Sequence, residues 1–166
     1  MERYDLVVIG AGPGGYVAAI RATQLGLKTA VVERDRPGGV CLNWGCIPSK
    51  AILTSAEMYE DLNHSEQYGI RVSGLSFDYA QVIKRSRDVA GRLAKGVEYL
   101  LKKNKVPLLR GAGRIENTNR VIIEPSGQNE QDAQQVEADR ILIATGSRER
   151  TLPGLEIDGK QVLTSY

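Results

Sequence analysis

The chain has only two cysteines and one histidine among its 166 residues. Two cysteines are too few for the disulfide framework that stabilises many small secreted domains. A protein zinc site usually takes four ligands, so Cys41, Cys46 and His64 cannot complete one without carboxylates or a second chain. We therefore predict no metal site and interpret His64 as an exposed surface residue.

Long hydrophobic runs and a strong excess of charge are also missing. The apolar run at residues 6–9 is shorter than the core of a signal peptide and much shorter than a membrane span. The 22 basic and 20 acidic side chains leave a net charge of +2, without the concentrated basic excess of a nucleic-acid surface. We expect a cytoplasmic protein that binds neither membranes nor nucleic acids.

The length and the 42% hydrophobic content allow one domain with a sizeable core. Apolar, β-branched runs predict buried strands at residues 6–9, 29–33, 106–109 and 141–144. Helical periodicity predicts helices over residues 16–25, from Pro48 to about residue 62, and over 77–102. This alternation predicts an α/β fold, with an open, mostly parallel sheet and helices on its faces.

The pattern changes between residues 113 and 138. Short extended pieces at 120–124 and 135–137 surround a polar stretch at 125–132, which we interpret as an exposed hairpin loop. We therefore expect a small antiparallel β excursion from the parallel sheet in this region.

The helix predicted over 77–102 carries a set of basic side chains away from its apolar side. They are Lys84, Arg85, Arg87, Lys95, Lys102 and Lys103. An acidic ligand could contact them, but a solvated face is the commoner reason for such a pattern, and we interpret them in that way.

A glycine pattern follows the first predicted strand and opens the first helix. Gly10, Gly12 and Gly15 match G-x-G-x-x-G, and Glu33 ends the second strand about 20 residues later. Such glycines allow a tight turn, close approach of a pyrophosphate and close helix packing, while the carboxylate can accept hydrogen bonds from a ribose. The pattern predicts a dinucleotide site, for NAD or FAD; the alternative is a plain tight turn with a solvated carboxylate.

The two cysteines lie five positions apart in the segment CLNWGCIPSK. A structural disulfide over so short a loop would remove little chain entropy. A redox pair has a better rationale, because Cys46 just precedes the helix expected near Pro48 and Lys50 lies one turn in, and both favour a thiolate. Cys41, on the preceding loop, would be the freer thiol. FAD accepts an electron pair from a dithiol, whereas NAD reacts poorly with thiols, so the pair favours a flavin.

Several segments together resemble one known family across nearly the whole chain. They are VVIGAGPGGYVAAIRATQLGLKTAVVE, GGVCLNWGCIPSKAIL, GVEYLLKKNKV, ILIATGS and LPG. The chain is similar to the pyridine nucleotide-disulfide oxidoreductases, and within them to the dihydrolipoamide dehydrogenase branch. The resemblance implies a Rossmann-like FAD-binding domain.

The resemblance also implies roles for individual residues. Cys41 would exchange with dihydrolipoamide, and Cys46 would be the thiolate that faces the flavin. The cofactor residues would be Gly10, Gly12, Gly15, Glu33, Lys50, Gly113, Thr145 and Gly146. The first three glycines would hold the pyrophosphate of FAD and the glutamate its ribose. The lysine would lie beside the reactive flavin nitrogen, the fourth glycine would offer backbone to the adenine, and the last two residues would close over the cofactor.

In the family's reaction, dihydrolipoamide reduces the disulfide, the dithiol reduces FAD, and reduced FAD passes a hydride to NAD. The implied partners are dihydrolipoamide or the lipoyl domain of a 2-oxo acid dehydrogenase complex, and a second copy of the full-length parent in a homodimer.

Length is the main departure from the family. The chain stops at Tyr166, and no second G-x-G-x-x-G follows a predicted strand. We expect residues 1–166 to be the N-terminal portion of the FAD-binding domain, truncated before the NAD-binding and dimer-interface domains and inactive alone. Two alternatives stay open at this point: a portion of a related flavin disulfide or mercuric ion reductase, and a stand-alone, non-catalytic module that binds flavin or senses thiols.

Overall fold

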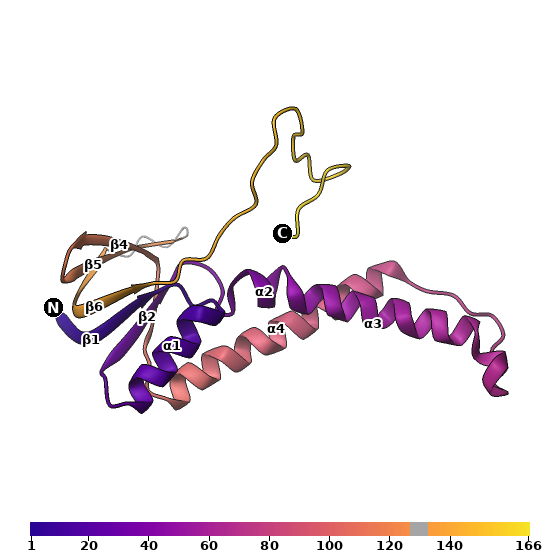
Figure 1. Ribbon diagram of the computed structural model, residues 1–166, viewed down its shortest axis with the longest axis horizontal. Helices are drawn as coiled ribbons and strands as arrows, with labels where there is room; N and C mark the ends of the chain where they lie inside the picture. The colour runs from indigo at the N-terminus through magenta and orange to yellow at the C-terminus, as the bar shows by residue number, and fades with distance from the viewer. Residues whose placement is uncertain (127–132) are drawn as a thin grey trace.

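The computed structural model describes residues 1–126 and 133–166, and these form one mixed sheet with helices (Figure 1). The strands of the described part are β1 (Glu2–Ile9), β2 (Thr29–Glu33), β3 (Leu108–Arg110), β4 (Ala112–Asn117), β5 (Arg120–Glu124) and β6 (Gln134–Ile143). Their order in the sheet is β3-β2-β1-β6-β5-β4. The pairs β3-β2, β2-β1 and β1-β6 are parallel, whereas β6-β5 and β5-β4 are antiparallel. The predicted α/β fold with an antiparallel excursion is confirmed.

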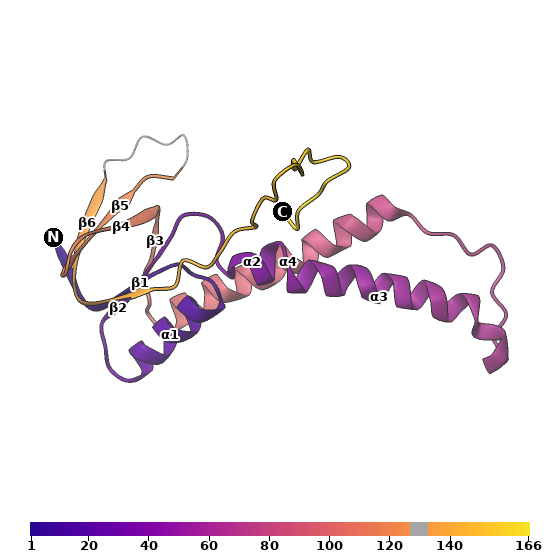
Figure 2. The same ribbon diagram turned by 45° about the horizontal axis from the view of Figure 1, so that its top comes forward.

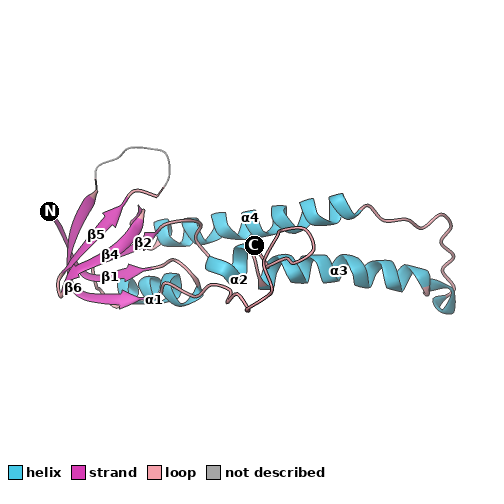
Figure 3. Ribbon diagram, turned by 90° about the horizontal axis from the view of Figure 1, so that it is seen from above, coloured by secondary structure: helices cyan, strands magenta, loops and turns pink. Residues whose placement is uncertain are grey.

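The helices are α1 (Pro13–Gln24), α2 (Gly39–Asn43), α3 (Cys46–Asn63), the short 3₁₀ helix η1 (Ser65–Tyr68) and α4 (Tyr79–Lys103). Asp78 caps α4, because its Oδ1 accepts a hydrogen bond from the Gln81 N–H at 3.2 Å. Figure 3 shows α3 and α4 side by side, extending together away from the sheet. No helix in the described ranges has the combination of length and apolar content needed to cross a bilayer.

The two faces of the sheet are covered differently, which corrects the expectation of helices on both. Val8 and Val31 point to the face that packs against α1 and α4, among buried residues that include Val97 and Leu101. The alternate residues, such as Val7, point to the opposite face, which β5 and β4 cover by folding back over the sheet (Figure 2). Side chains alternate between the faces of a strand, so both faces of β1 and β2 are apolar.

The last strand, β6, is one continuous element, although the sequence predicted two separate pieces at 135–137 and 141–144. It pairs with β1 from Glu2↔Val136 to Ile9↔Ile143, and its first residues also pair with β5. The polar residues between the two predicted pieces are exposed, whereas Val136 and Ala138 are buried. The strand at 141–144 was predicted to be buried, but Leu142 and Ile143 are exposed. Pairing along both edges overrides the weak local signal.

The other predicted elements agree closely with the structure. The strand at 29–33 is confirmed as β2, the helix over 77–102 as α4, and the strand at 106–109 begins two residues later as β3. The polar stretch interpreted as a hairpin loop lies mostly at residues 127–132, outside the described residues.

Candidate functional site

The carboxyl ends of β1, β2 and β6 open into a single cleft of about 390 Å³. Its lining includes Gly10, Gly12, Glu33, Cys41, Thr145 and Gly146. Loops that follow parallel strands meet at one edge of a sheet, where ligands of such folds usually bind. The structure thus brings together the glycine turn, the carboxylate after β2, one cysteine and the residues after β6.

The glycine turn between β1 and α1 needs glycine at two positions for packing. Gly10 has φ +107°, and a Cβ there would overlap the Ala144 carbonyl; a Cβ on Gly15 would overlap the Gly10 carbonyl. Gly12 differs, because its hypothetical Cβ has only the Gly39 Cα near it, at 3.8 Å. Gly12 therefore leaves space at the N-terminus of α1, where backbone N–H groups and the helix dipole favour an anion.

Glu33 ties the glycine turn to the end of β2. Its Oε2 accepts a hydrogen bond from the Ala11 N–H at 2.7 Å, and its Oε1 accepts one from the Asp35 N–H at 2.9 Å. The sequence predicted a carboxylate for a ribose and missed this structural contact. The two N–H groups hold the carboxylate at the cleft wall, and each oxygen keeps a second lone pair for a ligand.

A second hollow of about 100 Å³ adjoins the cleft. The two share Gly10, Glu33, Arg34 and Thr145 in their linings, and Gly113 of β4 also lines the hollow. A Cβ on Gly113 would meet Ile9 Cγ2 at 3.0 Å, so this glycine lets β4 approach the sheet closely. The shared residues make the cleft and the hollow neighbours, and we call the two spaces together the path from Gly113 to Cys41.

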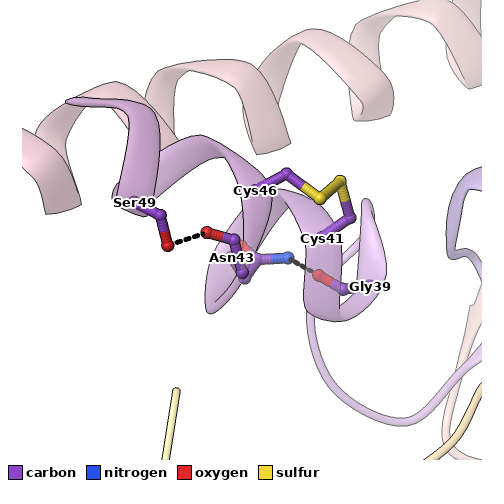
Figure 4. Close-up of a disulfide and its surroundings, with 6 residues drawn as sticks. Gly39, Cys41, Asn43, Cys46 and Ser49 are labelled. Atoms are coloured by element: carbon purple, nitrogen blue, oxygen red, sulfur yellow. Dashed lines mark hydrogen bonds between the residues drawn. A yellow bond between two sulfur atoms is a disulfide. The ribbon is translucent and has the colours of Figure 1, made fainter. Parts of the chain in front are cut away.

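Cys41 and Cys46 form a disulfide that joins α2 to α3 (Figure 4). Their Cα atoms lie 4.7 Å apart. One expectation needs correction here, because Cys41 lies in the helix α2 and not on a loop. The helix expected near Pro48 is α3, which begins at Cys46 and has Pro48 in its first turn. No local pattern predicted α2, because Gly and Val in a five-residue segment have weak helix propensity.

Tertiary contacts hold α2 in place. The Asn43 side chain is buried, and its Nδ2 donates a hydrogen bond to the Pro37 carbonyl at 3.0 Å. It donates a second to the Gly39 carbonyl at 3.1 Å, which Figure 4 shows. The Gly38 N–H donates to the Ala11 carbonyl at 2.7 Å, which attaches this loop to the glycine turn. Gly38 and Gly39 have φ values of +99° and +60°, which favour glycine. Sequence reasoning missed the role of this glycine pair and of Asn43; the Gly-Gly dipeptide was the available signal.

Not every predicted site residue lies in the cleft. Cys41 lines it, whereas Cys46 and Lys50 are exposed on α3 and are not part of the lining. Trp44, between the cysteines, does line the cleft, and Tyr166 stacks on its ring with the two centroids 5.0 Å apart. The sequence did not single out either aromatic residue.

The predicted surface position of His64 is confirmed. It is exposed at the end of α3, and its Nδ1 lies 3.3 Å from Glu60 Oε1. The described residues contain no group of three or more His, Cys, Asp or Glu side chains arranged to hold a metal ion.

Comparison with known proteins decides the family. The sequence profile of the pyridine nucleotide-disulphide oxidoreductases matches residues 4–165. The chain belongs to this family. Two curated relatives within it are named dihydrolipoyl dehydrogenase: one from Zymomonas mobilis is 49% identical over 99% of the chain, and one from Bacillus subtilis is 48% identical over 98%. The chain spans about a third of their length, 35% of each.

A solved structure of another protein has the same fold. The flavoprotein disulfide reductase RclA from Escherichia coli, determined as a Cu(II) complex, matches with a TM-score of 0.75. The match covers 92% of this chain and 31% of that one, at 22% sequence identity. This likeness confirms the predicted Rossmann-like architecture of the chain.

Proposed function

We propose that the chain is the FAD-binding, disulfide-carrying N-terminal portion of a dihydrolipoyl dehydrogenase. In this proposal residues 1–166 belong to one FAD-binding domain, with the antiparallel excursion at about 113–138. The observation that carries the proposal is that Cys41, half of a disulfide, lines the same cleft as the glycine turn and Glu33. A redox pair and a dinucleotide-type cleft are thus parts of one site.

The cleft fits an extended dinucleotide in three respects. The open space at Gly12 beside the α1 N-terminus suits a pyrophosphate. The fixed carboxylate of Glu33 suits the ribose hydroxyls, and the adjoining hollow beside Gly113 suits the adenine. Thr145 and Gly146 would close the path after β6. These residues would hold FAD, and the Cys41 end of the path would lie nearest its reactive ring.

The proposed half-reaction is an exchange at the disulfide. One thiolate of dihydrolipoamide attacks Cys41 Sγ, the S–S bond breaks, and Cys46 leaves as a thiolate. The second lipoyl thiol, on losing its proton, attacks the lipoyl sulfur of the mixed disulfide and releases Cys41. Two electrons pass to the cysteine pair, and two protons pass to solvent or to the cysteines. Cys46 suits the leaving role because it begins α3, where the helix dipole stabilises a thiolate.

Bound FAD would supply a two-electron acceptor for this dithiol, with NAD as the final acceptor. Lys50 lies one turn beyond Cys46, and we propose that its charge favours the thiolate. The proposed thiol partner is the lipoyl domain of a 2-oxo acid dehydrogenase complex, and the proposed assembly of the parent enzyme is a homodimer. We propose a cytoplasmic location, where a reducing environment suits a cysteine pair that must cycle.

The test follows the visible absorption of FAD mixed anaerobically with the chain. We expect retained FAD and bleaching of its oxidised band after two equivalents of dihydrolipoamide, since the disulfide and FAD each take up two electrons. The Cys41→Ser/Cys46→Ser variant is the matched control, since it should retain FAD and stay oxidised. Turnover of dihydrolipoamide with NAD by the parent enzyme completes the test, against glutathione disulfide and mercuric ion as competing substrates.

Two results would count against the proposal. Preference of the parent for glutathione disulfide or mercuric ion would assign the chain to another branch of the family. Equal bleaching in the wild type and the double serine variant would show that the cysteine pair carries no electrons to FAD.

A further inference from the structure

Two arginines of α4 reach the two helices that carry the cysteines. Arg87 Nη1 donates a hydrogen bond to the carbonyl oxygen of Asn43, the last residue of α2, at 3.2 Å. Arg85 Nη1 donates to the carbonyl oxygen of Ala51, in α3, at 2.8 Å. Both side chains are exposed, as the interpretation of a solvated face expects, and each also donates one hydrogen bond to a neighbouring helix. We call this pair the arginine clamp.

The local packing of α4 explains how the two arginine side chains reach α2 and α3. Ser86, between the arginines, is 1% exposed, and Ala90, one turn later, is 4% exposed. These small residues let α4 lie close to its neighbours. Successive helix residues point about 100° apart, so Arg85 and Arg87 extend on opposite sides of Ser86. The Arg85 side chain therefore reaches α3, and the Arg87 side chain reaches α2.

The clamp acts on the two elements that the disulfide joins. Apart from the disulfide, only Trp44 and Gly45 connect α2 to α3 along the chain. The helix α2 has five residues, too few to be stable alone, and its carbonyl groups at the C-terminus need donors. When the S–S bond opens, the hydrogen bonds from α4 still connect both helices to the same support.

We propose that Arg85 and Arg87 are positioning residues that keep Cys41 and Cys46 within bonding reach when the pair is reduced. This inference rests on the proposed redox function of the pair. It follows by thermodynamic linkage that the disulfide and the clamp strengthen each other by the same factor. Without the clamp, α2 and α3 gain conformational freedom in the reduced form, whereas the S–S bond still holds them together in the oxidised form. The dithiol is then favoured.

The experiment is an equilibrium of the full chain with dithiothreitol, with free thiols trapped by alkylation and counted by mass spectrometry. Dithiothreitol supplies two electrons and two protons, its two thiols close into a cyclic disulfide, and the protein S–S bond becomes two thiols. We expect the equilibrium constant for forming the protein disulfide to fall about threefold for Arg85→Ala and for Arg87→Ala. A change of this size is near the lower end of the free energy that one hydrogen bond contributes. The double variant should fall about tenfold, since the two sites act on different helices.

Two controls separate the clamp from other effects. Lys84→Ala removes a basic residue of the same helix that is exposed and makes no hydrogen bond in the described part of the chain, so its equilibrium constant should match the wild type. Arg87→Lys keeps a charged donor and should recover part of the loss. A purely electrostatic role has the opposite sign, because removing positive charge disfavours thiolates and would favour the disulfide.

The outcomes distinguish this inference from the proposed function. A wild-type pair that cycles reversibly, with alanine variants equal to Lys84→Ala or shifted toward the disulfide, would overturn the clamp and leave the proposed function intact. A wild-type pair that dithiothreitol cannot cycle would overturn both. Far-UV circular dichroism checks folding, and the single variants carry the test if the double variant unfolds.

Discussion

Replacing Asn43 with aspartate changes one buried NH₂ group to oxygen at the junction of α2 and the glycine loop. The Asn43 amide donates hydrogen bonds to two carbonyls, at 3.0 and 3.1 Å, and the residue is only 4% exposed. An ionised carboxylate cannot donate, so the Pro37 and Gly39 carbonyls would face a negative charge. No volume changes, and the effect isolates the hydrogen bonds.

The size of the effect follows from those two contacts. Leaving a buried polar group unpaired costs about 1–3 kcal/mol, so Asn43→Asp should lower the free energy of unfolding by about 3 kcal/mol at neutral pH. Burial and the carbonyl dipoles should raise the pKa of the introduced carboxyl above its unfolded value of about 3.9. The folded state then binds the proton more tightly. The penalty should be full above the folded pKa, shrink as the pH falls through it, and be smallest below the unfolded pKa.

Urea unfolding of the oxidised chain at about pH 7 and about pH 4 measures the loss in free energy of unfolding. Each variant is compared with the wild type at the same pH. Asn43→Ala should lose about 2 kcal/mol at both pH values, because it cannot ionise. Asn63→Asp, exposed at the end of α3, should cost less than about 1 kcal/mol. A loss for Asn43→Asp below about 0.5 kcal/mol, or one that grows on acidification, would refute the reasoning.

Three further predictions concern the same fold. Gly15→Ala should lower the free energy of unfolding by about 3 kcal/mol through overlap with the Gly10 carbonyl, whereas Gly14→Ala, with open space around its Cβ, should not; thermal unfolding compares them. Burial and a hydrogen bond to Glu2 raise the pKa of Tyr4 to about 12, so its contribution to stability should be present below pH 10 and be lost as the pH rises through 12. Phenolate absorbance should show a late-ionising component that is absent in Tyr4→Phe. FAD binding should quench the fluorescence emission of Trp44, the single tryptophan. If equilibrium dialysis shows that FAD binds but the emission does not change, the flavin lies elsewhere.

The sequence predicted those parts of the fold that depend on local pattern. The strand at 29–33 and the long helix ending near residue 102 have strong periodicity and clear boundaries, and both are confirmed. The continuity of β6 and the short helix α2 were missed. Val136 is buried by pairing with β1 and β5, and Asn43 is buried by bonds to residues of a loop. Contacts with residues elsewhere in the chain stabilise both elements, and a short window of sequence does not contain those residues.

The candidate site divides in the same way. Glycine spacing and the carboxylate at 33 located one wall of the cleft, because that wall is built from a single βαβ unit. The contributions of Gly39, Trp44 and Arg87 were not predicted. Each depends on contact between segments far apart in the chain, such as the hydrogen bond from α4 to the end of α2.

The pairing of β1 with β6 also bears on how the protein is made. Glu2 is translated long before its partner Val136. Until then one edge of β1 is an open strand edge, which invites wrong pairing. The Gly10 turn meets its neighbour Ala144 later still. Nascent chains that end before about residue 145 should therefore depend on chaperones. The cleft becomes complete only when β6 has been synthesised and has paired with β1.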